Sequence, residues 1–183
     1  MATQLTTRAR IAAAALTFSA LGFSAYLNHE GFAPRAVPPI RGDVPTYGFG
    51  SILGPDDNPV KPGTTITPTA AVKLAIRDVQ RHEAVLKKCL GDVEISQPMF
   101  DAFMSVDLNT GGVCNSSIPA KLRAGDYIAA CETILDFGNF CTKPKIRDAN
   151  GKLHCPPGAL KPIAGLQKRR QAERDMCMQG VVP

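Results

Sequence analysis

Three polar side chains, Glu30, Asp43 and Thr46, are of types that could take part in acid–base chemistry, such as cleavage of a glycosidic bond. Glu30 follows an apolar stretch of the chain, and apolar surroundings favour the protonated form that a general acid needs. Asp43 and Thr46 lie three residues apart, where glycine and proline predict a turn. Glycoside hydrolysis uses an acid on one side of the bond and a base or charge stabiliser on the other. The pattern fits Glu30 as the acid and Asp43 as its counterpart. A solvated glutamate at a helix end and an ordinary turn at residues 42–46 are the alternatives.

The segment that follows Glu30 is too rich in turn-forming residues for long helices. Residues 31–66 contain seven prolines and six glycines, which predict short strands joined by turns. The texture changes at Thr67, which is expected to cap a helix that has Pro68 at its first position and ends before Gly91.

Apolar residues recur at helical spacing through most of the remaining chain. A second helix is expected to start at Ser96 and to stop at Gly111. Further helices are expected at residues 119–124, 126–137 and 163–178. These elements predict an α+β fold, in which a small β-rich lobe and a larger α-helical lobe enclose the candidate residues.

The N-terminal segment has the layout of an export signal. Arg8 and Arg10 precede 17 largely apolar residues, Ile11 to Leu27, just short of the roughly 20 that span a bilayer. We expect residues 1–27 to form an uncleaved apolar anchor helix with a cytoplasmic N-terminus, and residues 28–183 to be the exported domain. A removed signal peptide and a buried alanine-rich helix of a soluble domain are the alternatives.

The net charge of +5 and the pI near 9.0 favour an acidic partner. Nucleic acid, anionic lipid and bacterial cell wall all satisfy that condition. A nucleic-acid partner is disfavoured, because aromatic residues do not alternate with the basic ones and the chain has an export signal. The histidines are scattered and the cysteines lack metal-site spacing, so neither a metal site nor another cofactor is expected.

Five stretches, in the same order along the chain, resemble the phage lysozymes of the T-even type, glycoside hydrolase family 24. They are Glu30-Gly31, TYGFG at 46–50, FMSVDLNTG at 103–111, KLRAGDYIAAC at 121–131 and GLQKRRQAERDMC at 165–177. The resemblance spans residues 29 to 178, nearly the whole of the part expected to be exported. The resemblance implies a lysozyme-like fold with an active-site cleft between its lobes. It also implies hydrolysis of the β-1,4 bond between N-acetylmuramic acid and N-acetylglucosamine in peptidoglycan.

The resemblance also implies roles for individual residues. Glu30 matches the general acid, and Thr46 matches the threonine that orients the attacking water. The family aspartate would fall at Ile40, so Asp43, the only carboxylate between Glu30 and Thr46, is nominated in its place. Two residues are expected to bind substrate: Asn109 through its amide, unless it only ends a helix, and Tyr47 by lining the cleft, unless it is core.

Two basic residues of the last motif, Arg169 and Arg170, have two interpretations. One of them reaches Glu30 in the resting enzyme, or both belong to a solvated basic face.

Six cysteines without metal spacing predict disulfides and an oxidising compartment. Fifteen pairings are formally possible. By position we expect Cys89 with Cys114, Cys131 with Cys177, and Cys141 with Cys155.

The weakly apolar N-terminus also resembles the signal-arrest-release segments of some endolysins. This resemblance implies a monomeric enzyme that is tethered to the host inner membrane, is released to the periplasm and then causes lysis. Since the segment contains no cysteine, control by membrane topology is expected rather than control by thiol exchange within it.

Two other functions remain open. A lytic transglycosylase cuts the same bond with one glutamate and leaves an anhydro-sugar. A non-catalytic wall-binding module would keep its function after Glu30→Gln.

Overall fold

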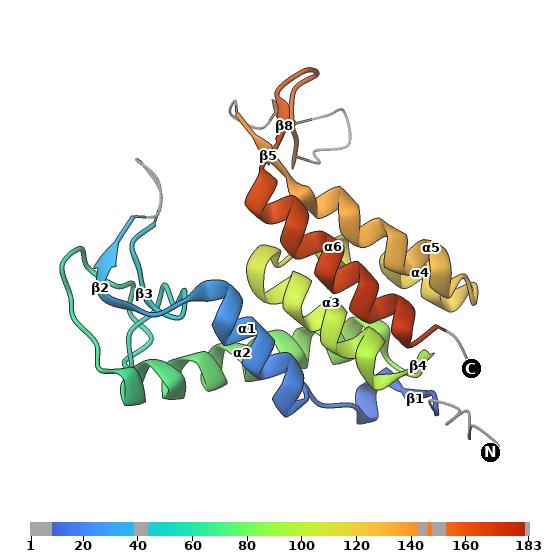
Figure 1. The fold of residues 1–183 in the computed structure, drawn as a ribbon, viewed down its shortest axis with the longest axis horizontal. Helices are drawn as coiled ribbons and strands as arrows, with labels where there is room; N and C mark the ends of the chain where they lie inside the picture. Colours follow the sequence, from blue (N-terminus) through green and yellow to red (C-terminus); the bar gives the residue numbers. More distant parts are fainter. Residues whose placement is uncertain (1–8, 39–43, 143–145, 148–152, 182–183) are drawn as a thin grey trace, which may run out of the picture.

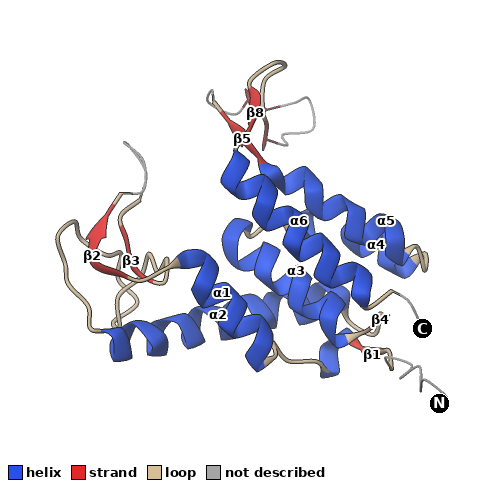
Figure 2. Cartoon of the chain, viewed as in Figure 1, coloured by secondary structure: helices blue, strands red, loops and turns tan. Residues whose placement is uncertain are grey.

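The computed structural model describes residues 9–38, 44–142, 146–147 and 153–181. Helices dominate the chain, and the short strands lie at its periphery (Figure 2). A small lobe contains strands β2 (Ala33–Val37) and β3 (Thr46–Gly48), and a larger lobe contains most of the helices (Figure 1). The long helix α2 (Pro68–Leu90) contacts β3 in the small lobe and α3 (Gln97–Thr110) in the large one. The predicted α+β architecture, with a small β-rich lobe beside a larger helical lobe, is confirmed.

The apolar N-terminal segment does not form the single helix that its composition predicts. Strand β1 (Ile11–Ala12) pairs antiparallel with β4 (Glu94–Ile95) and is followed by the 3-10 turn η1 (Ala13–Ala15). Helix α1 (Ala20–Glu30) begins only after a break of four residues. Within the described ranges, no helix combines the length and the apolarity that crossing a membrane requires.

Hydrogen bonds from distant residues explain why α1 starts so late. Ser19 has extended backbone and caps the helix by accepting the Gly22 N–H at 3.0 Å. The Ser19 N–H donates to Asp101 at 3.0 Å, and its hydroxyl donates to the other oxygen of Asp101. The Phe18 N–H donates to Glu83 at 2.9 Å. Two carboxylates of the helical lobe therefore fix the chain at the break.

The N-terminal segment belongs to the main hydrophobic core. Ala13, Leu16 and Tyr26 are buried in the same cluster as the apolar side chains of α3. In this structure, the expected boundary between residues 27 and 28 does not separate two packing units. The role of residues 1–27 as a membrane anchor stays a prediction.

The small lobe has a core of its own. Strands β2 and β3 are antiparallel, with Ala33 opposite Gly48 and Val37 opposite Thr46. Ala36 of β2 and Tyr47 of β3 are buried in one cluster with Val60 of the following loop and Leu74 of α2. As predicted, the described residues of the Pro- and Gly-rich segment form short strands and turns.

Helices α2 and α3 begin and end where their capping residues predict. The Thr67 hydroxyl accepts the Ala70 N–H at 3.3 Å, and Gly91 ends α2 with a positive φ of 59°. Ser96 precedes α3, and Gly111 ends it in the left-handed conformation. Nine consecutive residues of α3, from Met99 to Asp107, are buried, so this helix is the centre of the large lobe.

The remaining helices surround α3. They are η2 (Val113–Asn115), α4 (Ile118–Arg123), α5 (Tyr127–Glu132), η3 (Thr133–Gly138) and α6 (Ala164–Gln179). The helix predicted over 126–137 changes at Thr133 from α to 3-10 geometry. Its start was predicted well, because the Asp126 side chain caps it by accepting the Ala129 N–H at 3.1 Å.

All three expected disulfides are present. Cys89–Cys114 joins α2 to η2, and Cys131–Cys177 joins α5 to α6. Cys141–Cys155 closes a projection from the helical lobe between η3 and α6 (Figure 1). Two antiparallel strand pairs build this projection: β5 (Asn139–Cys141) with β8 (Leu160–Pro162), and β6 (Ile146–Arg147) with β7 (Leu153–His154).

Candidate active site

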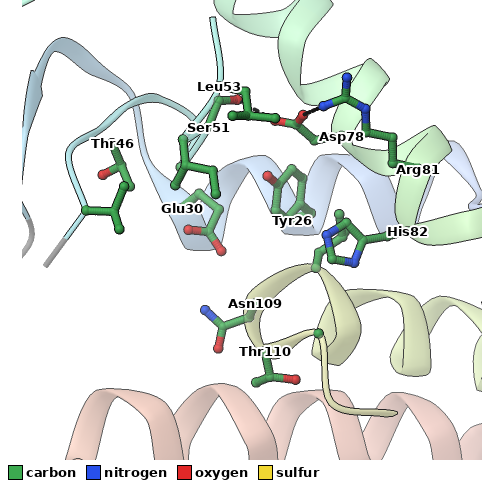
Figure 3. A pocket seen from close by; sticks show the side chains of 15 residues that line it. Tyr26, Glu30, Thr46, Ser51, Leu53, Asp78, Arg81, His82, Asn109 and Thr110 are labelled. Atoms are coloured by element: carbon green, nitrogen blue, oxygen red, sulfur yellow. Dashed lines mark hydrogen bonds and ion pairs between the residues drawn. The ribbon is translucent and has the colours of Figure 1, made fainter. Parts of the chain in front are cut away.

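A cavity of about 640 Å³ lies between the lobes, large enough for part of a glycan chain. Its walls come from α1, from β3 and the loop after it, from α2, and from the C-terminal end of α3 (Figure 3). The lining residues are Tyr26, Glu30, Val44, Thr46, Gly50, Ser51, Ile52, Leu53, Asp78, Arg81, His82, Leu108, Asn109, Thr110 and Gly111.

Glu30 is the last residue of α1, and its carboxylate faces the cavity (Figure 3). Its Oε1 accepts a hydrogen bond from Arg169 Nη1 at 2.6 Å, and the side chain is only 19% exposed. Of the two interpretations of the basic residues of α6, the ion pair with Glu30 is confirmed, through Arg169. The prediction that apolar groups surround Glu30 is therefore wrong on the side that faces α6, where the buried guanidinium of Arg169 contacts the carboxylate.

A buried network holds Arg169 in place. Arg169 Nε donates to Glu173 at 3.1 Å, and Glu173 also pairs with Arg170 at 2.9 Å. Glu173 is 1% exposed, and it accepts the Ser105 hydroxyl from α3. With Glu30, the network contains two carboxylates and two guanidinium groups, so its formal charges balance. Such balance is what allows charged groups to be buried.

The loop after β3 closes against α1 beside Glu30. The Tyr26 hydroxyl donates to the Phe49 carbonyl at 2.8 Å, and burial, with Glu30 and Asp78 nearby, strongly raises the pKa of Tyr26. The hydroxyl therefore keeps its proton and its role as donor. Gly50 has a φ of 86°, and a Cβ there would lie 3.1 Å from Glu30 Oε2. A glycine at this position lets the loop pass close to the carboxylate.

A cluster of charges fixes the same loop to α2. Arg77 donates to the carbonyls of Gly54 and Leu53 at 2.7 and 3.2 Å. Asp57 pairs with Arg77 at 2.9 Å and with Arg81. These contacts make the loop a fixed wall of the cavity.

Strand β3 directs its two predicted site residues to opposite sides. Thr46 lines the same cavity as Glu30 and comes from the small lobe (Figure 3). Tyr47, only 2% exposed, is buried in the core of the small lobe and is not among the lining residues. Neighbouring side chains of a strand point to opposite faces, so only one of the two can face the cleft. The expectation that Tyr47 lines the cleft is thus corrected.

Asn109 lines the cavity near the end of α3. Its Oδ1 accepts a hydrogen bond from Arg170 Nη2 at 2.7 Å. Because a guanidinium can only donate, this contact fixes the amide oxygen toward α6. The amide nitrogen of Asn109 is therefore the atom that can donate to a ligand.

Asp43 lies outside the described residues, so its position relative to Glu30 stays a prediction. In the described part of the chain, Glu30 and Asp78 are the carboxylates that line the cavity. Asp78 accepts the Ser51 hydroxyl at 2.6 Å and lies 3.6 Å from Arg77. No group of three or more metal-binding side chains occurs among the described residues.

Sequence reasoning missed several cavity residues: Tyr26, Ser51, Asp78, Arg81 and His82. Only Tyr26 had a usable signal, because it precedes Glu30 by four residues and so shares its helical face. The apolar periodicity of α2 predicts the helix but does not predict how the small lobe packs against it.

Comparison with known proteins identifies the family of this chain. The family model described as phage lysozyme matches residues 27–173. No curated protein sequence matches the chain significantly.

Two solved phage proteins share 26% of their residues with this chain. The endolysin from Escherichia coli O157:H7 phage FAHEc1 has a TM-score of 0.71, and the match covers 92% of this chain and 98% of that one. P22 lysozyme has a TM-score of 0.61, with 89% and 99% covered. The muramidase domain of SpmX from Asticaccaulis excentricus shares the fold, with a TM-score of 0.68 at 17% identity over 88% and 97% of the two chains. Since the family model spans most of the chain, the protein belongs to the phage lysozyme family.

Proposed function

We propose that this protein is an endolysin that hydrolyses the β-1,4 bond between N-acetylmuramic acid and N-acetylglucosamine in peptidoglycan. The observation that carries the proposal is that Glu30 and Thr46 line one cavity between the lobes (Figure 3). Family membership supports it, as do the endolysin and lysozyme structures that resemble the chain.

In the proposed reaction, the Glu30 carboxyl donates its proton to the glycosidic oxygen while the bond to C1 of N-acetylmuramic acid breaks. Water adds to C1 and loses its proton to a base. Thr46 orients that water through its hydroxyl, and Asp43 is the proposed base.

The ion pair between Glu30 and Arg169 describes the resting enzyme. Arg169 holds the Glu30 carboxyl group where it faces the cavity. The link to Glu173 keeps Arg169 in place throughout.

Replacement of Asp43 by Asn tests the proposed base. We expect this variant to lose about 10²- to 10⁴-fold in the rate of solubilisation of purified peptidoglycan, the usual contribution of a general base. Asp136→Asn, at an exposed position outside the cavity, is the matched control and should keep the wild-type rate. A fully active Asp43→Asn enzyme would contradict the two-carboxylate mechanism and favour transglycosylation by Glu30 alone.

We also propose that residues 1–27 first hold the exported enzyme at the inner membrane, and that they join the folded domain after release to the periplasm as a monomer. The basic residues before the apolar stretch support the first state. The burial of Ala13, Leu16 and Tyr26 in the enzyme core supports the second, because it gives the released segment a more favourable place than water.

Substitutions at two exposed positions should strengthen membrane binding without changing the folded enzyme. Ala14 and Ser24 face solvent in the folded enzyme, so Ala14→Leu with Ser24→Leu makes the segment more apolar without disturbing the core. We expect a larger membrane-bound fraction and delayed lysis, but unchanged activity of the detergent-extracted enzyme. Gly22 is unsuitable, since a Cβ there would lie 2.5 Å from Phe18. Ala14→Ser with Ser24→Asn is the control, and unchanged fractionation of the leucine variant would refute the membrane-held state.

A further inference from the structure

We propose that His82 binds a sugar ring next to the scissile bond, and that buried Asp107 holds its imidazole in the one tautomer that can do so. This inference rests on the proposed function, because it assigns a substrate contact within the same cleft. Neither residue belongs to the catalytic set of Glu30, Asp43 and Thr46.

The two residues form a close pair between helices. His82 Nδ1, on α2, lies 2.8 Å from Asp107 Oδ2, on α3. The Asp107 side chain is 3% exposed, whereas that of His82 is 33% exposed. The buried partner therefore supports an imidazole whose remaining surface faces the cavity.

The surroundings of Asp107 determine which ring nitrogen carries hydrogen. Its Oδ1 accepts the Val113 N–H at 3.2 Å, and its Oδ2 faces His82 Nδ1 as an ionised carboxylate, which can only accept. A carboxylate cannot donate, and His82 Nδ1 must therefore supply the hydrogen in their contact. Nε2 has no hydrogen-bond partner in the described part of the chain. In the neutral ring Nε2 is an acceptor, which suits a sugar hydroxyl or the N–H of an acetamido group.

The position of His82 identifies which part of the glycan it would contact. Tyr26 stands between Glu30 and His82 (Figure 3). Glu30 and His82 line the same cavity from different helices, α1 and α2, and Tyr26 precedes Glu30 by four residues, about 6 Å along the axis of α1. It would thus contact a sugar beyond the bond that Glu30 protonates. Leu108 and Ile52 line the same cavity, where they offer apolar surface to a sugar ring.

A purely structural role is the competing explanation, since the pair also ties α2 to α3. Removal of a structural contact lowers stability and leaves substrate binding by the folded protein unchanged. Removal of a substrate contact raises KM and leaves kcat unchanged, because the interaction is the same in the ground and transition states. The two roles therefore predict different kinetics.

The test compares His82→Phe and His82→Gln with the wild type, below their melting temperatures, on peptide-free glycan strands of alternating N-acetylglucosamine and N-acetylmuramic acid. One lost neutral hydrogen bond predicts a KM about 5- to 10-fold higher for His82→Phe with kcat unchanged. His82→Gln should recover part of the affinity, because its amide oxygen can accept near the position of Nε2. Gln80→Ala, exposed on the same helix, is the control and should match the wild type.

A second measurement needs no substitution of His82. In the full chain with Glu30→Gln, the imidazole ¹⁵N resonances are followed while an uncleaved tetrasaccharide of the same two sugars is added. The chain has only three histidines, so assignment is direct. We expect hydrogen on Nδ1 and a saturable shift of Nε2.

An unshifted Nε2 at saturating saccharide, or a KM for His82→Phe within two-fold of the wild type, would overturn the proposal. Failure of the proposed function looks different, because the wild type itself would then not cleave the glycan. The resonance of Nε2 still decides the His82 contact in that case.

Discussion

The Glu30→Gln enzyme is expected to dissolve purified peptidoglycan about 10²- to 10⁴-fold more slowly than the wild type, the usual contribution of a general acid. The glutamine amide could not supply the proton that the leaving sugar oxygen requires. The amide oxygen could still accept from Arg169, and Arg169 keeps its contact with Glu173, so the network should remain largely intact. The measurement is the initial rate of turbidity loss at matched concentrations of folded protein.

Glu94→Gln is the control for Glu30→Gln. This glutamate is exposed on β4 and lies outside the cavity, so its replacement should leave the rate unchanged. A Glu30→Gln enzyme within a factor of three of the wild type would show that Glu30 is not the acid and would favour a non-catalytic wall-binding module.

Removal of residues 1–27 is expected to abolish cooperative folding, and activity with it. The deletion takes away Leu16 and Tyr26 from the core, and most of the helix that carries Glu30. It also leaves the nearly buried carboxylate of Asp101 without its two hydrogen bonds from Ser19. Burial of one large apolar side chain contributes about 1.5–3 kcal/mol, and a whole domain is stable by only about 5–15 kcal/mol.

Two leucines of the N-terminal segment provide a matched test of that expectation. Leu16 is 5% exposed and Leu21 is 84% exposed. Leu16→Ala should lower the free energy of unfolding by about 2–5 kcal/mol, and Leu21→Ala by less than about 0.5 kcal/mol. Urea denaturation followed by circular dichroism measures both. Equal effects, or a truncated chain that melts cooperatively near the wild-type temperature, would mean that the segment does not belong to the folded enzyme.

Local signals predicted most of the helical lobe. Thr67 and Gly91 bound α2 because capping depends on the residues at the ends themselves. The same holds for Ser96 and Gly111 around α3. The disulfide pairs were expected from their positions along the chain, and two of the three join helices.

The N-terminal break could not be predicted from local sequence. Ser19 is followed by residues that suit a helix, but what holds it is Asp101, 82 positions along the chain. Composition therefore indicated one apolar helix where tertiary contacts impose a strand, a 3-10 turn and a shorter helix.

The candidate site was predicted only in part. Motif resemblance placed Glu30, Thr46 and Asn109 correctly in the cavity, because these residues are fixed within the matched stretches. The prediction that Tyr47 lines the cleft was wrong, because the pleat of β3 directs this side chain into the core of the small lobe. His82 and Asp78 were missed because they become cavity residues only when the small lobe packs beside α2.

The most direct test of the account is the mass of the fragments that the full-length protein releases from purified peptidoglycan. Hydrolysis by Glu30 with water as nucleophile predicts fragments that end in a reducing N-acetylmuramic acid, about 18 Da heavier than the anhydro form because one water is added per bond cut. Mass spectrometry after borohydride reduction would detect these ends, and the Glu30→Gln protein should release almost none. Fragments that end in anhydro-N-acetylmuramic acid would contradict hydrolysis and establish transglycosylation, and an absence of cleavage would contradict enzymatic function.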